Sequence, residues 1–73
     1  MNSASTREAR QAYEIVRWRR RQLTDAGFGL PLASRLARDP RWDLHALLEL
    51  VERGCPPGLA ARILAPLDEK EAA

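Results

Sequence analysis

A chain of 73 residues with a net charge of +2 has room for one small domain and for no large core. A domain of this size buries only about 60% of the surface that its unfolded chain exposes, so we expect it to gain stability from a partner or a second copy. One cysteine excludes an internal disulfide, and one histidine without a Cys/His cluster excludes a structural zinc site.

The distribution of apolar and charged residues predicts where the protein works. No stretch approaches the roughly 18 apolar residues of a membrane span, and the N-terminus lacks the apolar run of a signal peptide. We therefore expect a cytoplasmic protein without membrane contact. Residues 7–21 carry six arginines and two glutamates, whereas residues 22–53 and 54–73 each have a net charge of −1. The basic character is thus expected on the first helix alone.

The first predicted helix is long and runs to about Ala26. Ser5 and Glu8 fit a capping box at its start, and Gly27 fits the left-handed residue that follows many helices. At about 100° per residue, a thin apolar stripe follows the helix, formed by Ala9, Ala12, Val16 and Leu23 with Ile15 and Ala26 on its flank. Trp18 points about 140° away from this stripe, where only another surface would cover it.

The second predicted helix starts near Pro31, whose missing N–H is tolerated in a first turn. It ends at Asp39-Pro40, because the residue before a proline avoids the helical conformation. Its buried side is expected to consist of Leu32, Ala33, Leu36 and Ala37.

Two further helices are predicted after Pro40. Asp43 is a suitable N-cap for the third helix, and Trp42 with Leu47 fits a hydrophobic staple. The third helix has the most apolar residues (Leu44, Leu47, Leu48, Leu50 and Val51), so we expect it to be the most buried. The fourth helix follows Pro56-Pro57, ends before Pro66, and is expected to point Leu59, Ala60, Ile63 and Leu64 inward.

Two stretches of the chain share one pattern, 27 residues apart. Residues 23–36 read LTDAGFGLPLASRL and residues 50–63 read LVERGCPPGLAARI. Each copy has Leu, an acid, Gly and an apolar residue, followed by Leu, Ala, Arg and a final Leu or Ile. We interpret each copy as a helix end, a glycine turn with positive φ, and the start of the next helix.

The predicted fold is therefore all-α. We expect a small four-helix domain over residues 5–67, built as two tandem helix-turn-helix hairpins with a long N-terminal helix. Residues 1–4 and 68–73 are expected to form flexible tails, because they carry no apolar periodicity.

A set of residues in the first copy and beyond follows the arrangement of a known module. The set comprises the turn Ala26-Gly27-Phe28, the small Ala33 five residues after the phenylalanine, and the pair Asp43-Leu44 that opens the third helix. In these residues, positions 23–53 resemble a ubiquitin-associated (UBA-like) three-helix module, and the resemblance implies how the helices cross. Ala26 replaces the methionine that helps such modules bind ubiquitin, and a fourth helix follows, so ubiquitin binding is not carried over.

The second copy has the spacing from glycine to recognition helix of a DNA-binding motif. Gly54, Cys55, Pro56 and Pro57 precede a helix that carries Ala60, Arg62 and Ile63. This segment resembles a DNA-reading helix-turn-helix, which reads base edges with groups near the start of its second helix. Those positions here hold Pro57, Gly58, Ala61 and Arg62. Arg62 is the single useful hydrogen-bond donor, and Asp68 and Glu69 would repel phosphates.

The candidate docking site is the segment Arg17-Trp18-Arg19-Arg20-Arg21, because Arg and Trp are enriched at binding hot spots. Arg17 and Arg21 share one side of the helix, whereas Arg19 and Arg20 flank the apolar stripe and can extend over the core. The predicted partner-binding residues are Arg10, Tyr13, Arg17, Trp18 and Arg21. The competing interpretation is a solvated helix face with Trp18 packed under a tail.

The other notable side chains favour structural roles. His45 has no second ligand or catalytic partner, so we interpret it as an ordinary histidine. Cys55 lies near a helix start, where a thiol's pKa can be lowered. A reactive cysteine is weighed there against a small apolar residue that fills the corner, as Phe28 does in the first copy. The chain has no Ser–His–Asp set and no glycine-rich phosphate loop, so we expect a non-enzyme without metal or cofactor.

The function predicted from these features is protein interaction. The chain would act as an adaptor, an accessory subunit or a homo-oligomeric regulator, docking through its Arg/Trp-rich first helix onto another protein or a second copy of itself. The alternative is a helix-turn-helix-like transcriptional regulator that binds nucleic acid through Arg17, Arg20, Arg21 and Arg62.

Overall fold

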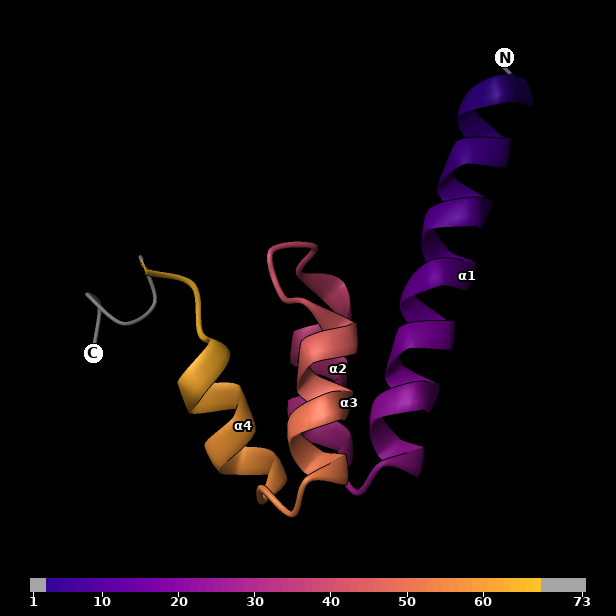
Figure 1. Ribbon diagram of the computed structural model, residues 1–73. Coiled ribbons are helices and arrows are strands. Elements are labelled where there is room, and N and C mark those ends of the chain that lie inside the picture. Colours follow the sequence, from indigo (N-terminus) through magenta and orange to yellow (C-terminus); the bar gives the residue numbers. More distant parts are fainter. Residues whose placement is uncertain (1–2, 68–73) are drawn as a thin grey trace.

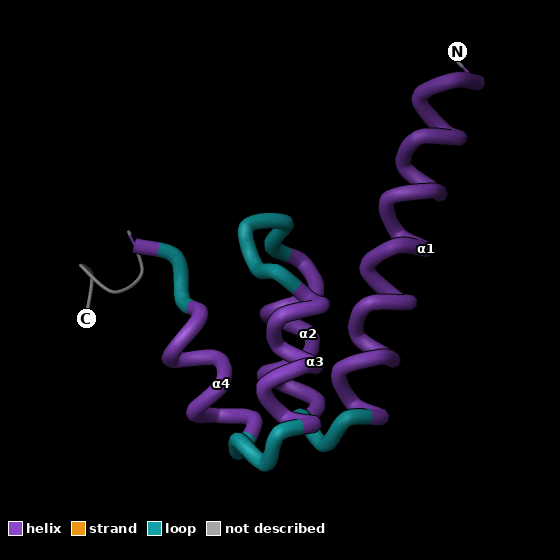
Figure 2. Tube along the Cα trace, in the orientation of Figure 1, coloured by secondary structure: helices purple, strands orange, loops and turns teal. Residues whose placement is uncertain are grey.

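The computed structural model describes residues 3–67, and side chains from Arg7 onward. Within these residues the chain forms four α-helices and no strand (Figure 2). They are α1 (Ser3–Asp25), α2 (Leu30–Arg38), α3 (Leu44–Glu52) and α4 (Pro57–Leu64). The predicted all-α fold with a long first helix is confirmed.

The helix ends agree with the predicted ones except at the start of α1. This helix begins at Ser3, so Ser5 lies inside it and is not the predicted N-cap. The capping box is therefore wrong in position, because an N-cap residue stands outside the helical turns. The predicted tails, 1–4 and 68–73, lie outside the described residues apart from Ser3 and Ala4, which begin α1.

Both glycine turns have the same hydrogen bonds. Gly27 has a φ of 108°, its N–H donates to the Thr24 carbonyl, and the N–H of Phe28 donates to the Leu23 carbonyl. This combination is a Schellman motif, which satisfies carbonyls that the helix end leaves without a donor.

The second turn repeats the first, 27 residues on. Gly54 has a φ of 97°, its N–H donates to the Val51 carbonyl, and the N–H of Cys55 donates to the Leu50 carbonyl. The repeat in the sequence therefore corresponds to a repeat in backbone conformation.

The start of α3 is held by the predicted cap. The Asp43 carboxylate accepts a hydrogen bond from the Ala46 N–H at 3.1 Å. Trp42 and Leu47, the two residues of the staple, are both buried in the same core cluster. Trp42 is thus a core residue.

The core lies chiefly around α2, and the expectation that α3 is the most buried helix is wrong. Three residues of α2 are buried, Ala33, Leu36 and Ala37, whereas α3 contributes Leu47 alone. The alanines let neighbouring elements approach α2 closely. The larger side chains of α3 stay partly exposed, because Leu48 and Val51 line an open groove beside α1.

The buried face of α4 also differs from the prediction. Ala60 and Ala61 are buried and Leu64 is half-buried, whereas Leu59 and Ile63 are exposed. The helix turns its small residues to the core, because these permit close packing. Its larger apolar residues form the outer rim of the domain.

The helices pack as neighbours along the chain. α1 packs mainly on α2 and α3 on α4, which is compatible with the two predicted hairpins. α3 lies between α1 and α4, and α1 extends well beyond the other helices (Figure 1). The molecule is elongated, with extents of 47 × 29 × 19 Å.

Candidate functional site

The N-terminal half of α1 projects from the domain with its side chains in solvent. Every residue from Arg7 to Ile15 is exposed, including Ala9 and Ala12 of the predicted apolar stripe. The stripe packs on the core only from Val16 onward, and Leu23 is its fully buried member. Helices are stabilised mainly by packing of one face, so this half lacks the support that most protein helices have.

Three large apolar side chains are exposed on α1. Tyr13 is 64% exposed, Ile15 57% and Trp18 56%. Single exposed apolar residues are ordinary on protein surfaces, whereas these three lie within six positions of one projecting helix. Trp18 is therefore largely in solvent here, and the tails that the competing interpretation places over it lie mostly outside the described residues.

The five predicted partner-binding residues are all exposed, yet they do not form one face. Tyr13 and Trp18 are five positions apart, which places them about 140° from each other around the helix. Tyr13 belongs to what we call the arginine face, which consists of Arg10, Tyr13, Arg17 and Arg21. Trp18 belongs to a second face, so the helix presents two chemically different surfaces.

We call the second surface the Ile–Trp face; it consists of Gln11, Glu14, Ile15 and Trp18. These residues line a shallow depression of about 380 Å³. Their spacing of three and four residues puts them in one row along α1. All four belong to one helix, so the depression is an open surface that a partner helix could cover.

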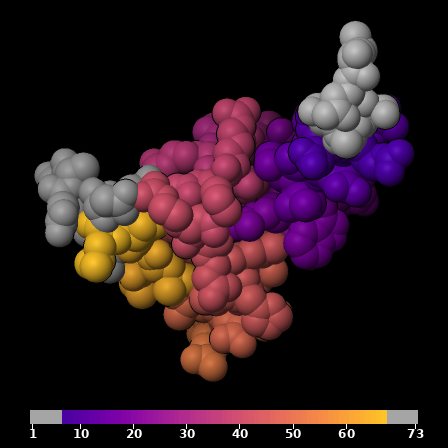
Figure 3. Space-filling model, turned by 90° about the horizontal axis from the view of Figure 1, so that it is seen from above, coloured from indigo at the N-terminus to yellow at the C-terminus, as the bar shows by residue number. Residues whose placement is uncertain are grey.

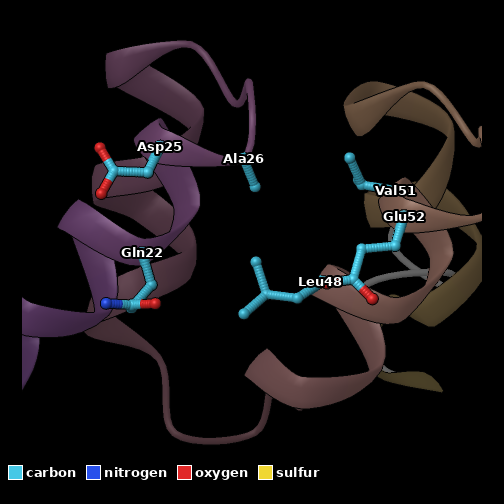
Figure 4. A pocket seen from close by; sticks show the side chains of 6 residues that line it. All are labelled: Gln22, Asp25, Ala26, Leu48, Val51 and Glu52. Carbon is cyan, nitrogen blue, oxygen red and sulfur yellow. The ribbon is translucent and has the colours of Figure 1, made fainter.

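The Ile–Trp face continues into a groove between α1 and α3, with a volume of about 330 Å³. Figure 4 shows Leu48 and Val51 of α3 on one side and Ala26 of α1 on the other, all pointing toward the gap. The rims carry Asp25 and Glu52, which hold equivalent positions in the two copies of the repeat. The groove therefore has an apolar floor and an acidic rim, which sequence reasoning did not identify.

Arg19 joins α1 to the segment that precedes α3. Its Nη2 donates to the Trp42 carbonyl at 2.8 Å, and its side chain is half-buried. Its buried Nε has no hydrogen-bond partner. Arg19 and the half-buried Arg20 therefore lie toward the core as predicted, and Arg19 holds the packed half of α1 in place.

The residues of the predicted nucleic-acid site lie on separate parts of the molecule. Arg17 and Arg21 are exposed on α1, and Arg20 is half-buried at the edge of the core. Arg62 is exposed on α4, and α4 lies on the other side of the domain from α1 (Figures 1 and 3). A cluster of arginines is thus present on α1, without a contribution from Arg62.

The residues weighed for chemistry have ordinary surroundings. His45 is exposed in the first turn of α3, and residues 3–67 hold no group of three or more potential metal ligands. Cys55 is a free, half-buried thiol that lies 3.6 Å from the Pro56 carbonyl oxygen.

Comparisons with protein-family models, curated proteins and solved structures find no match to this chain. The resemblances to UBA-like modules and to helix-turn-helix motifs therefore stay predictions that rest on the quoted residues. Among the helices that the structure describes, none has the length and apolar character needed to span a bilayer.

Proposed function

We propose that this chain is a small helical protein-interaction module that docks through α1. The observation that carries the proposal is the exposure of Ile15 and Trp18 on a helix that projects beyond the core. Covering these side chains removes apolar surface from water at a gain of about 25 cal/mol per Å². An Arg- and Trp-rich centre with a polar rim is typical of interfaces.

The proposed role is that of an adaptor, an accessory subunit or a homo-oligomeric regulator. Such roles need a surface and a stable scaffold, and they require no catalytic group. The proposal assigns the chain no reaction and no cofactor. A cytoplasmic location is part of the proposal, supported by a single cysteine that can form no disulfide within the chain.

Capture by the immobilised full-length chain from a lysate of its source organism tests the proposal. Wild-type protein should retain a defined partner, and Trp18→Ala should lose it. Leu30→Ala is the matched control, because Leu30 is an equally exposed apolar residue at the start of α2, away from the Ile–Trp face. If Trp18→Ala retains the same partners as wild type, docking through this face is wrong.

A second candidate function, a nucleic-acid-binding regulator, is favoured by one observation. Arg10, Arg17 and Arg21 are exposed together on the arginine face of α1. Arginines in such a row suit phosphates, and binding of this kind weakens steeply as salt rises. Fluorescence anisotropy with a labelled duplex at about 50 mM salt tests it. Absence of binding under these conditions eliminates this candidate.

A further inference from the structure

We infer that the partner of the Ile–Trp face is α1 of a second copy of this chain, packed antiparallel; this inference rests on the proposed docking through α1. A two-fold axis would pass between Arg17 and Trp18. Two identical surfaces then meet, so the surface must be complementary to itself. The order of charges along α1 has this property.

The charges complement each other because of their spacing about the proposed axis. In an antiparallel pair centred between positions 17 and 18, residues face each other when their numbers add to 35. On the flank of the Ile–Trp face that borders the arginine face, Glu14 then lies opposite Arg21 of the second copy, and Asp25 lies opposite Arg10 of the second copy. Each pair occurs twice by symmetry, which gives four contacts between opposite charges.

In a parallel pair of the same helices, like charges would face each other. Each residue would face its own counterpart, so Arg10, Glu14 and Arg21 would each meet a like charge. Like charges placed opposite each other across an interface are costly and select against that arrangement. The sequence of α1 thus favours the antiparallel pair.

The apolar centre of the surface coincides with the proposed axis. Trp18, which is 56% exposed, lies beside the axis in both copies, so the two indole rings would meet there. Aromatic rings that meet in this way add stability beyond the area that they bury. Ile15 lies one turn away on the same face and would be covered by the second helix.

The groove between α1 and α3 extends this interface beyond α1. In the antiparallel arrangement the first described turns of the second copy's helix, with Arg7 and Arg10, reach the end of α1 where the groove opens. Asp25 and Glu52 lie on the rims of that groove. Its acidic rim therefore meets the basic end of the exposed half-helix. This contact explains how α1 could be supported where its own domain does not cover it.

The body of the domain does not obstruct this arrangement. α1 packs on its own core through Leu23 and Arg19, and Leu23 lies about 140° around the helix from Trp18. The second copy would therefore approach a face of α1 other than the one that holds Leu23 in the core. Each half-exposed helix would lie along the outer face of the other.

Sedimentation of the purified full-length chain over a concentration series tests the inference. Wild-type protein should dimerise. Glu14→Arg and Arg21→Glu should each raise the dimer dissociation constant about tenfold or more, since each turns two attractive contacts into repulsive ones. The double variant Glu14→Arg/Arg21→Glu should restore the wild-type value, because the pairs reform with their charges exchanged.

Two control variants make the same Glu→Arg and Arg→Glu changes at positions outside the proposed interface. Glu49→Arg on α3 and Arg62→Glu on α4 are exposed positions outside the proposed interface, and both should dimerise as wild type does. Circular dichroism of each variant checks that the helices are intact. A wild-type chain that stays monomeric overturns the inference, as does a double variant that remains as weak as the single ones. The capture experiment with Trp18→Ala decides the proposed function separately.

Discussion

The two copies of the repeat share a backbone and differ in what covers them. Both end a helix with a positive-φ glycine and the same pair of turn hydrogen bonds. Leu36, the last residue of the first copy, is fully buried, whereas the equivalent Ile63 is 49% exposed. Phe28 is buried and the equivalent Cys55 is half-buried. Only the alanines, Ala33 and Ala60, are fully buried in both copies.

This difference shows what a repeated pattern encodes. Glycine and alanine act through backbone conformation and close approach, which are local and therefore repeat faithfully. The burial of larger side chains depends on neighbouring elements. α2 packs along α1, whereas α4 is an outer helix that packs mainly on α3 (Figure 1). The acids of the two copies, Asp25 and Glu52, remain exposed and share the groove between α1 and α3.

The largest expected change in the free energy of unfolding concerns the residues that follow the two glycines, Phe28 and Cys55. Phe28→Ala removes a buried aromatic ring and should lower the free energy of unfolding by about 3–5 kcal/mol. A loss of this size is a large part of the total free energy of unfolding of a small domain. Cys55→Ala should lower it by less than about 1 kcal/mol, because the thiol is small and half-buried. Urea denaturation monitored by circular dichroism measures both. Equal losses would show that the second turn is as deeply packed as the first.

The last residues of the copies form the next comparison. Leu36→Ala leaves a cavity in the core and should lower the free energy of unfolding by about 2–5 kcal/mol. Ile63→Ala removes a side chain that is half in solvent and should lower it by less than about 1 kcal/mol. Thermal unfolding of the two variants beside wild type gives the difference. A larger loss for Ile63→Ala would contradict the burial described above.

Most of the fold could be predicted because it depends on local signals. The glycines, prolines and the Asp43 cap determine where helices start and stop, and all three act within a few residues. The capping box failed because Ser5 carries the right side chain in a stretch that is already helical. Which helix is most buried could not be predicted from apolar content. α3 has more large apolar residues than α2, but part of its surface faces the open groove.

The candidate site could be predicted only in part. Trp18 stood out because it falls outside the apolar stripe, and the structure places it in solvent. The prediction grouped Trp18 with Tyr13, whereas the helix puts the two on different faces. Ile15 was assigned to the flank of the packed stripe, because periodicity does not tell where a helix leaves its core. The groove needs residues from two helices, so no single stretch of sequence signals it.

The two glycines offer a test of what the copies have in common. Gly27→Ala and Gly54→Ala should each lower the free energy of unfolding by about 1–2 kcal/mol, because both positions require a positive φ. An added Cβ at Gly27 would lie 3.8 Å from the Pro57 Cγ, an ordinary contact, and none arises within 4 Å at Gly54. Strain should therefore be the same at both sites. Unequal losses in urea denaturation would show that the surroundings of the two turns matter as well as their backbone.

The smallest expected effect lies in the linker between the copies, where Asp39 pairs with Arg41. The Arg41 Nη2 donates to the Asp39 carboxylate at 2.7 Å, and its backbone N–H donates to the same group at 3.0 Å. The side-chain hydrogen bond from Arg41, followed by the backbone one, lowers the pKa of Asp39 from 3.8 to about 2. A carboxyl with a lowered folded-state pKa contributes stability at pH above its unfolded value and loses it as the pH falls.

Asp39→Asn should therefore be slightly less stable than wild type above about pH 4, and the difference should vanish as the pH approaches 2. The effect should be small because the pair is partly exposed and solvent screens it. Urea midpoints of both proteins across this pH range measure it, and an NMR titration of the Asp39 carboxyl locates its pKa directly. A titration midpoint near the ordinary 3.8 would mean that the ion pair does not persist in solution.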